Sequence, residues 1–119
     1  MKQFAILLAC LGAAACSHAT PPDTLSQLRA IGRDAACSSD QQCRTVPLGA
    51  KSCGGPEGYL AYSTVRNDPA KVAQLAERYR EERRAANARS GMVSDCRYMA
   101  DPGAVCVAGT CKLGGLSDR

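Results

Sequence analysis

The cysteines are the residues of this chain whose type and spacing most directly suggest chemistry. Eight occur among 119 residues, and six lie beyond Cys16: Cys37, Cys43, Cys53, Cys96, Cys106 and Cys111. The short intervals between them are C-x5-C, C-x9-C, C-x9-C and C-x4-C, whereas zinc sites and thiol oxidoreductases commonly use C-x2-C. An even number of cysteines in a small exported chain favours structural disulfides. We therefore expect no metal and no cofactor.

This sequence has few residues that could carry out acid–base catalysis. Nucleophilic and general-base mechanisms usually need a histidine or a buried acid–base pair. The one histidine, His18, falls in a short N-terminal tether or is removed with the leader. Glu81 and Glu82 are adjacent, so they diverge on a helix and form no pair of facing carboxylates. We predict that the protein is not an enzyme.

The first fifteen residues have the pattern of a secretory signal. A short positive segment precedes the apolar run Phe4 to Ala15, which is too short to span a bilayer. The following Ala13-Ala14-Ala15-Cys16 resembles the lipobox of bacterial lipoproteins. That resemblance implies that residues 1–15 are removed, that Cys16 is lipidated, and that Ser17 directs sorting to the outer membrane. The alternative is cleavage after Ala19, which releases a soluble chain.

Beyond the leader we expect a short tether at residues 16–22 and one cysteine-rich domain at residues 23–119. The only Phe is Phe4 and there is no Trp, so the hydrophobic core must be thin. Disulfides supply the missing stability, at roughly 2–4 kcal/mol each. The predicted fold class is α+β: a small disulfide-stapled domain with two helices and a short antiparallel sheet that ends in a hairpin.

Two helices are predicted from caps and apolar spacing. Asp23 or Thr24 caps a first helix that runs to about Ala36. Asp68, Pro69 and Gly91 delimit a second helix. The inward-facing residues, at helical spacing, are Leu25, Leu28 and Ile31 in the first helix and Val72, Leu75, Ala76, Tyr79 and Ala86 in the second.

The remaining segments predict strands. Arg44 to Leu48 is a strand that lies at a sheet edge or else breaks at Pro47, because Pro47 cannot donate to a ladder. Tyr59 to Ser63 is a strand with both tyrosines on one face, or else the first turn of a helical segment. Met92 to Met99 alternates as a further strand, and Ala104 to Leu113 forms a hairpin that turns at Ala108-Gly109.

The hairpin suggests one disulfide by geometry. A two-residue turn sets Cys106 opposite Cys111 at a position close enough to bridge. For the other four cysteines we expect the disulfides Cys37–Cys43 and Cys53–Cys96. A rival connectivity ties Cys43 to the C-terminal hairpin.

Two features suggest a partner. Arginines crowd the second half of the second helix, and Arg80, Arg83 and Arg84 form a candidate surface for anionic lipid headgroups or an acidic envelope component. The alternative for them is a solvated face with interleaved glutamates. No aromatic residues interleave the arginines, so we expect no nucleic acid. Lys51, in a glycine-rich loop, suggests an inhibitor of trypsin-like proteases, or more simply a structural turn.

The spacing CxxDxxC…CGGPxxYLxYS…DC…DPGxxC…GxC resembles small cysteine-rich exported proteins of Gram-negative bacteria that carry no assigned activity. The resemblance implies no functional residues. The sequence thus predicts a lipid-anchored binding or structural module of the cell envelope, with the outer membrane favoured. The alternative is a soluble inhibitor or interaction protein that is periplasmic or secreted.

Overall fold

A computed structural model describes residues 22–91 and 93–115 of the chain. The predicted signal peptide, Cys16 and most of the tether lie outside the described residues, as does Met92. The element order confirms the predicted α+β class: α1 (Thr24–Arg33), the short 3-10 helix η1 (Asp40–Gln42), β1 (Cys43–Leu48), β2 (Gly58–Ser63), α2 (Pro69–Ser90), β3 (Ala104–Val107) and β4 (Thr110–Leu113).

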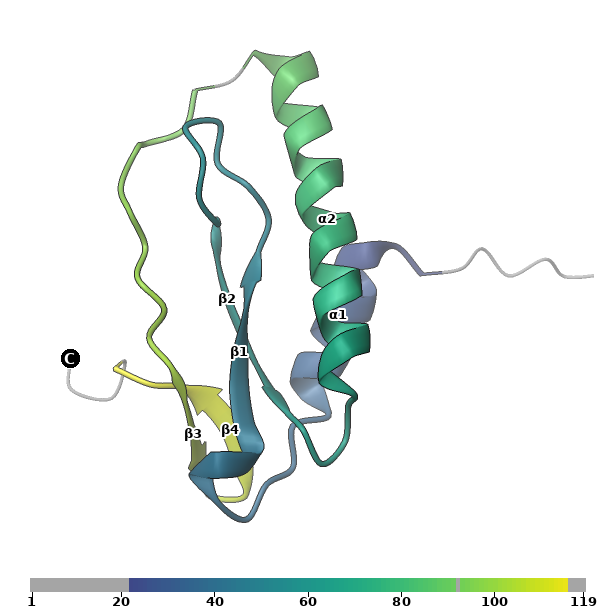
Figure 1. Cartoon of the computed structure of the whole chain (residues 1–119), viewed down its shortest axis with the longest axis vertical. Helices are drawn as coiled ribbons and strands as arrows, with labels where there is room; N and C mark the ends of the chain where they lie inside the picture. Colours follow the sequence, from purple (N-terminus) through teal and green to yellow (C-terminus); the bar gives the residue numbers. More distant parts are fainter. Residues whose placement is uncertain (1–21, 92, 116–119) are drawn as a thin grey trace, which may run out of the picture.

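The domain has three layers, with the antiparallel pair β1–β2 in the middle (Figure 1). Helices α1 and α2 cover one face of this pair, and residues 93–115, which include the β3–β4 hairpin, cover the other. Paired residues of an antiparallel ladder share a face, and successive residues alternate between faces. Val46 and Tyr62 therefore point to the helices, while Cys43 and Ala61 point to the hairpin.

The core on the helix side is small but well closed. Leu28 and Val72 are 0% and 1% exposed, and they pack with Val46, Tyr62 and Ala76. Each of these larger apolar side chains contributes roughly 1.5–3 kcal/mol by leaving water. The sequence correctly identified Leu28, Val72 and Ala76 as facing inward.

Helix α1 begins as predicted and ends earlier than predicted. The Asp23 side chain accepts a hydrogen bond from the backbone N–H of Ser26. The helix stops at Arg33 rather than near Ala36 because the next residues pair with the hairpin. The backbone N–H of Cys111 donates to the carbonyl of Ala35, and Ala36 forms an antiparallel bridge with Thr110.

Helix α2 has the predicted bounds. Asp68 accepts a hydrogen bond from the backbone N–H of Ala70, Pro69 occupies the first turn, and Gly91 ends the helix in the left-handed region at φ 63°. No described helix is long and apolar enough to cross a bilayer.

The strand at residues 59–63 is confirmed, but its predicted facing is wrong. Tyr59 and Tyr62 are three residues apart, so a strand places them on opposite faces. Tyr62 lies in the core against the helices. The Tyr59 hydroxyl instead donates to the backbone carbonyl of Met99 in the C-terminal layer.

The predicted strand at Met92 to Met99 is wrong, since residues 93–99 have no regular structure. This segment crosses the glycine-rich loop and meets no strand edge there. Its backbone groups bond to side chains instead: the N–H of Ser94 donates to the Ser52 hydroxyl, and the carbonyl of Arg97 accepts from Lys51 Nζ.

Three disulfides join the first half of the chain to the C-terminal layer: Cys37–Cys106, Cys43–Cys111 and Cys53–Cys96. The Cys53–Cys96 prediction is confirmed, and so is the rival connectivity that ties Cys43 to the hairpin. The predicted Cys37–Cys43 and Cys106–Cys111 bridges are wrong.

The hairpin register explains the error in connectivity. Cys106 does lie opposite Cys111, as predicted. Both side chains share the inward face of the hairpin, and there they meet Cys37 and Cys43, which stand on either side of η1. Each hairpin cysteine therefore bridges to one of the two cysteines beside η1 and not to the cysteine opposite it in the hairpin.

Candidate functional site: an apolar groove at a strand edge

The predicted arginine surface is largely paired with glutamates. Arg80 and Arg84 each form an ion pair one helical turn back along α2, to Glu77 at 2.8 Å and to Glu81 at 3.1 Å. Exposed pairs of this kind contribute about 0–1 kcal/mol to stability. They also reduce the positive charge that these residues offer to a partner.

Arg83 connects α2 to the loop between β1 and β2. Its Nε donates to Glu57 at 3.0 Å, and this hydrogen bond raises the pKa of the guanidinium. One turn further along, Asn87 donates to the backbone carbonyl of Ala50 in the same loop. Arg83 therefore lies on the surface of α2 and also supports the packing of α2 on this loop.

Lys51 is not presented to solvent as a protease-binding residue would be. Its side chain is 12% exposed, and Nζ lies 2.8 Å from the Asp95 carboxylate. The hydrogen bond from Lys51 lowers the pKa of Asp95. In this arrangement Lys51 fixes the glycine-rich loop to residues 95–97.

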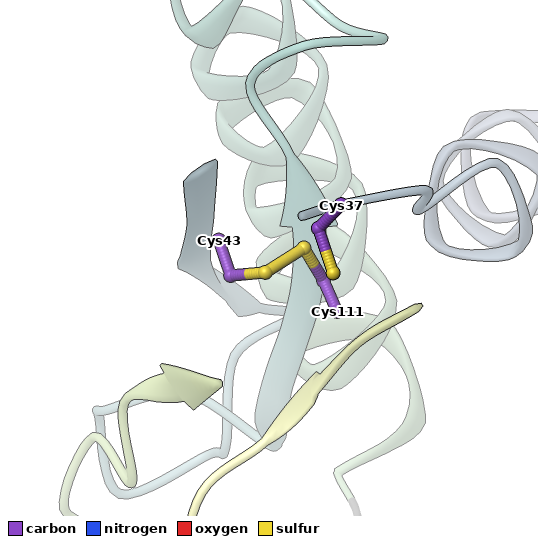
Figure 2. A group of neighbouring side chains, drawn as sticks. All are labelled: Cys37, Cys43 and Cys111. Atoms are coloured by element: carbon purple, nitrogen blue, oxygen red, sulfur yellow. A yellow bond between two sulfur atoms is a disulfide. The ribbon is translucent and has the colours of Figure 1, made fainter. Parts of the chain in front are cut away.

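Three cysteine sulfurs gather between the layers, but they are oxidised. The Sγ atoms of Cys37, Cys43 and Cys111 lie within 4.8 Å of one another. Figure 2 shows the Cys43–Cys111 bridge with the sulfur of Cys37 beside it. Metal ligation and nucleophilic attack require a thiolate, and every cysteine of the described part is in a disulfide. This cluster is a covalent joint between layers.

A groove of about 600 Å³ lies on the opposite edge of β2 from β1. Its walls come from the end of α1, from β2, from the β3–β4 hairpin and from the two glycines after it. The lining residues are Gly32, Tyr59, Leu60, Ala61, Val105, Val107, Cys111, Lys112, Leu113, Gly114 and Gly115. Most of these side chains are apolar, and the single charged one is Lys112. Concave apolar surfaces of this size are typical of binding sites.

Gly32 brings the end of α1 close to β2 at this groove. A Cβ at Gly32 would lie 2.6 Å from Cδ1 of Leu60 and 3.8 Å from the carbonyl oxygen of Ala61. A side chain at residue 32 would therefore displace the end of the Leu60 side chain, which lines the groove.

The floor of the groove is an unpaired strand edge. The N–H of Thr64 donates to the carbonyl of Gln42, which makes 42/64 a hydrogen-bonded pair of the β1–β2 ladder. Such pairs alternate with pairs whose N–H and C=O point away from the partner strand. Tyr59 and Ala61 belong to the second kind, so their backbone groups point away from β1. Among the described residues nothing hydrogen-bonds to these groups. We call this side the free edge of β2.

Pro47 supports this assignment. It pairs with Tyr59 in the register, and it has no N–H to donate. Pairs 47/59 and 45/61 are of the kind whose backbone groups point away from the partner strand. The nitrogen of Pro47 therefore points away from β2, where the ladder needs no hydrogen bond. The proline is therefore compatible with an intact ladder.

No local sequence pattern predicts this groove. Its residues predict a strand and a hairpin, and nothing in the pattern marks Val105, Val107 or Lys112. Their alternation predicts a hairpin but not what lies beside it. The free edge depends on which strands pair, and that information is not present in the local pattern.

No family model matches the chain, and no curated protein and no solved structure shows significant similarity to it.

Proposed function

We propose that this chain is a binding module of the bacterial cell envelope, without enzymatic activity, and that the groove beside β2 is its binding site. The observation that carries the proposal is the combination of an apolar cavity with an unpaired strand edge on its floor. An unpaired strand edge offers backbone donors and acceptors that a second strand can pair with, so such an edge is a favourable place for a ligand.

Export and anchoring form the second part of the proposal. Three disulfides support folding in an oxidising compartment. The leader at residues 1–15 supplies the route, and a lipid on Cys16 holds the domain to the membrane, with the outer membrane favoured. Pro22 and the short tether before Asp23 keep the domain close to the lipid surface.

Anchoring is tested by fractionating cells that express the wild-type protein and a Cys16→Ser variant. We expect the wild-type protein in the membrane fraction, with an intact mass that includes acyl chains on Cys16, and the variant in the soluble fraction. A mature chain that starts at Thr20 without acyl mass would contradict the anchor. The protein would then be a soluble, periplasmic or secreted interaction protein.

Binding at the groove is tested by crosslinking in intact cells. A photoreactive amino acid placed at Val107, which lines the groove, should give discrete adducts. The same amino acid at Val65 is the matched control, because Val65 is also exposed, at 61% against 47%, but lies outside the groove. Equal labelling from the two positions would contradict the proposal.

The arginine surface stays a second candidate, for anionic headgroups or an acidic envelope component. Arg78 and Arg89 favour it, since neither forms an ion pair with a described residue and both are exposed on α2. Reversing the charge of Arg84 should weaken sedimentation with vesicles that contain anionic lipid. Unchanged sedimentation would leave Arg80, Arg83 and Arg84 as a solvated face. We expect no nucleic-acid partner.

A further inference from the structure

We infer that the ligand of the groove is an extended peptide segment of another protein, which adds as a strand to the free edge of β2 at Tyr59 and Ala61. The inference rests on the proposed binding function and specifies the partner. It commits to a peptide with apolar residues and an acidic residue near Lys112.

The backbone geometry favours a peptide over other apolar ligands. The edge presents an N–H and a C=O at Tyr59 and again at Ala61, two residues further along the same strand. A second strand offers complementary donors and acceptors at the same repeat. An acyl chain would fill the cavity but would leave these polar groups without partners, which costs free energy for each group.

The chain itself shows that an extended segment fits between these elements. Ala35 and Ala36 pair with the outer edge of β4, through the N–H of Cys111 and the bridge to Thr110. The carbonyl of Ala36 also accepts a 2.6 Å hydrogen bond from the Ser63 hydroxyl at the end of β2. This segment therefore lies between β2 and β4 at one end of the gap.

The groove continues the same gap toward Tyr59 and Leu113, and there none of the described residues fills it. Leu113 belongs to the same kind of ladder pair in the hairpin as Cys111, whose N–H points outward to Ala35. The backbone of Leu113 is thus a second edge, on the opposite wall. A peptide strand in the groove can hydrogen-bond to both β2 and β4.

The side chains specify the peptide further. Val105, Val107 and Leu113 provide apolar contacts, and a peptide strand places alternate side chains on one face. Lys112 is the one charged residue of the lining and forms no ion pair with a described residue. A carboxylate on the peptide supplies the missing counter-charge, and it sets the direction in which the peptide lies.

The test uses the mature, disulfide-bonded protein and a displayed library of random seven-residue peptides as the probe. We expect selected peptides with alternating β-branched or aromatic residues and one Asp or Glu. Val107→Lys places a charge in the groove and should weaken their binding at least ten-fold, whereas Val65→Lys should leave it unchanged. Thermal unfolding of both variants checks that each is folded. Peptides that bind both variants equally would overturn the inference.

Two further comparisons, one between methylated peptides and one between lysine variants, separate backbone pairing with the strand edge from side-chain contacts. A selected peptide that is N-methylated at every second amide should lose binding at least ten-fold in the register whose amides face Tyr59 and Ala61. It should lose less in the other register, whose amides face only Leu113. Lys112→Glu should abolish the preference for an acidic residue, and Lys71→Glu, on the exposed face of α2, should not. Equal binding by both methylated peptides would overturn strand addition.

The outcomes also distinguish this inference from the proposed function. Crosslinks from Val107 to lipid, with no selected peptides, would support a binding groove and overturn the peptide partner. A dimer in sedimentation that Val107→Lys dissociates would identify a second copy as the occupant, and that too would overturn a foreign peptide. Absence of both crosslinks and selected peptides would remove the proposed function and the inference together.

Discussion

Removing the Cys43–Cys111 bridge tests how the three layers are held together. The bridge spans 68 residues in the sequence, which alone corresponds to about 4.4 kcal/mol of loop-closure entropy. The neighbouring Cys37–Cys106 bridge, however, already brings these segments together. Cys43 is six positions after Cys37 and Cys111 is five positions after Cys106, so the loop that the second bridge closes has about eleven residues. That loop corresponds to about 2.8 kcal/mol.

Burial adds to the effect at this bridge. Cys43 and Cys111 are 8% and 4% exposed and lie in the cluster with Ala35 and Ala61. Replacing both by alanine removes two buried sulfur atoms, at a further cost of about 1–2 kcal/mol. We therefore expect the Cys43→Ala, Cys111→Ala variant to lose about 4–5 kcal/mol of unfolding free energy, measured by denaturation without reductant.

The Cys53–Cys96 bridge provides the matched control. The other two bridges shorten its loop of 43 residues to about 25, so its entropic contribution is about 3.5 kcal/mol. Both of its cysteines are exposed, so their removal leaves no cavity. The Cys53→Ala, Cys96→Ala variant should lose about 3.5 kcal/mol, less than the variant at the buried bridge.

Two results would refute this reasoning. One is a loss in the Cys43→Ala, Cys111→Ala variant that is equal to or smaller than the loss in the control. The other is the appearance of two free thiols in that variant under denaturing conditions, because Cys37 and Cys106 should remain bonded to each other.

Three other predictions follow from single contacts. Leu28→Ala should destabilise the domain by about 2–5 kcal/mol in thermal or chemical unfolding, because the side chain is 0% exposed in the core; a loss below 1 kcal/mol would contradict the packing. Ser63→Ala should cost about 1–3 kcal/mol, because it leaves the Ala36 carbonyl without its 2.6 Å donor, while Ser63→Thr should retain part of the stability. Asp95→Asn should destabilise the protein at neutral pH but not in acid. The hydrogen bond from Lys51 lowers the folded-state pKa of Asp95 below the unfolded value, so its contribution is present above the unfolded pKa and is lost as the pH falls through the folded one. Unfolding curves of variant and wild type should therefore converge in acid, once Asp95 is protonated in the folded state, and a constant difference would contradict the ion pair.

The helices were predictable because their signals are local. Asp23 caps α1, and Asp68, Pro69 and Gly91 delimit α2 through contacts within one turn. The end of α1 was not predictable from the same information. It depends on the hairpin, some seventy residues later, where Thr110 forms a bridge with Ala36 and the N–H of Cys111 donates to the carbonyl of Ala35.

The disulfides show the same limit. The predicted register of the hairpin was correct, yet Cys106 and Cys111 bridge to Cys37 and Cys43 and not to each other. Geometry within one hairpin permits a bridge but does not exclude better partners elsewhere. Cys53–Cys96 was predicted correctly, but alongside two bridges that the structure does not contain.

The candidate site was the least predictable part. The arginines of α2 stand out in composition, but three of them pair with glutamates, and Glu57 comes from a separate loop. The groove has no composition signal, since valines of a hairpin and a glycine of a helix are unremarkable in sequence. Only the arrangement of the two strand pairs creates an unfilled gap between β2 and β4.

The central claim is that the free edge of β2 accepts a strand, and amide hydrogen exchange along β2 measures this directly. In the free protein the amides of Leu60 and Tyr62, which bond to β1, should be protected, and those of Tyr59 and Ala61 should exchange rapidly. Addition of a selected peptide should protect Ala61 and leave the Val65 amide unchanged. Slow exchange at Ala61 in the free protein, or no gain in protection when the peptide is bound, would contradict the account.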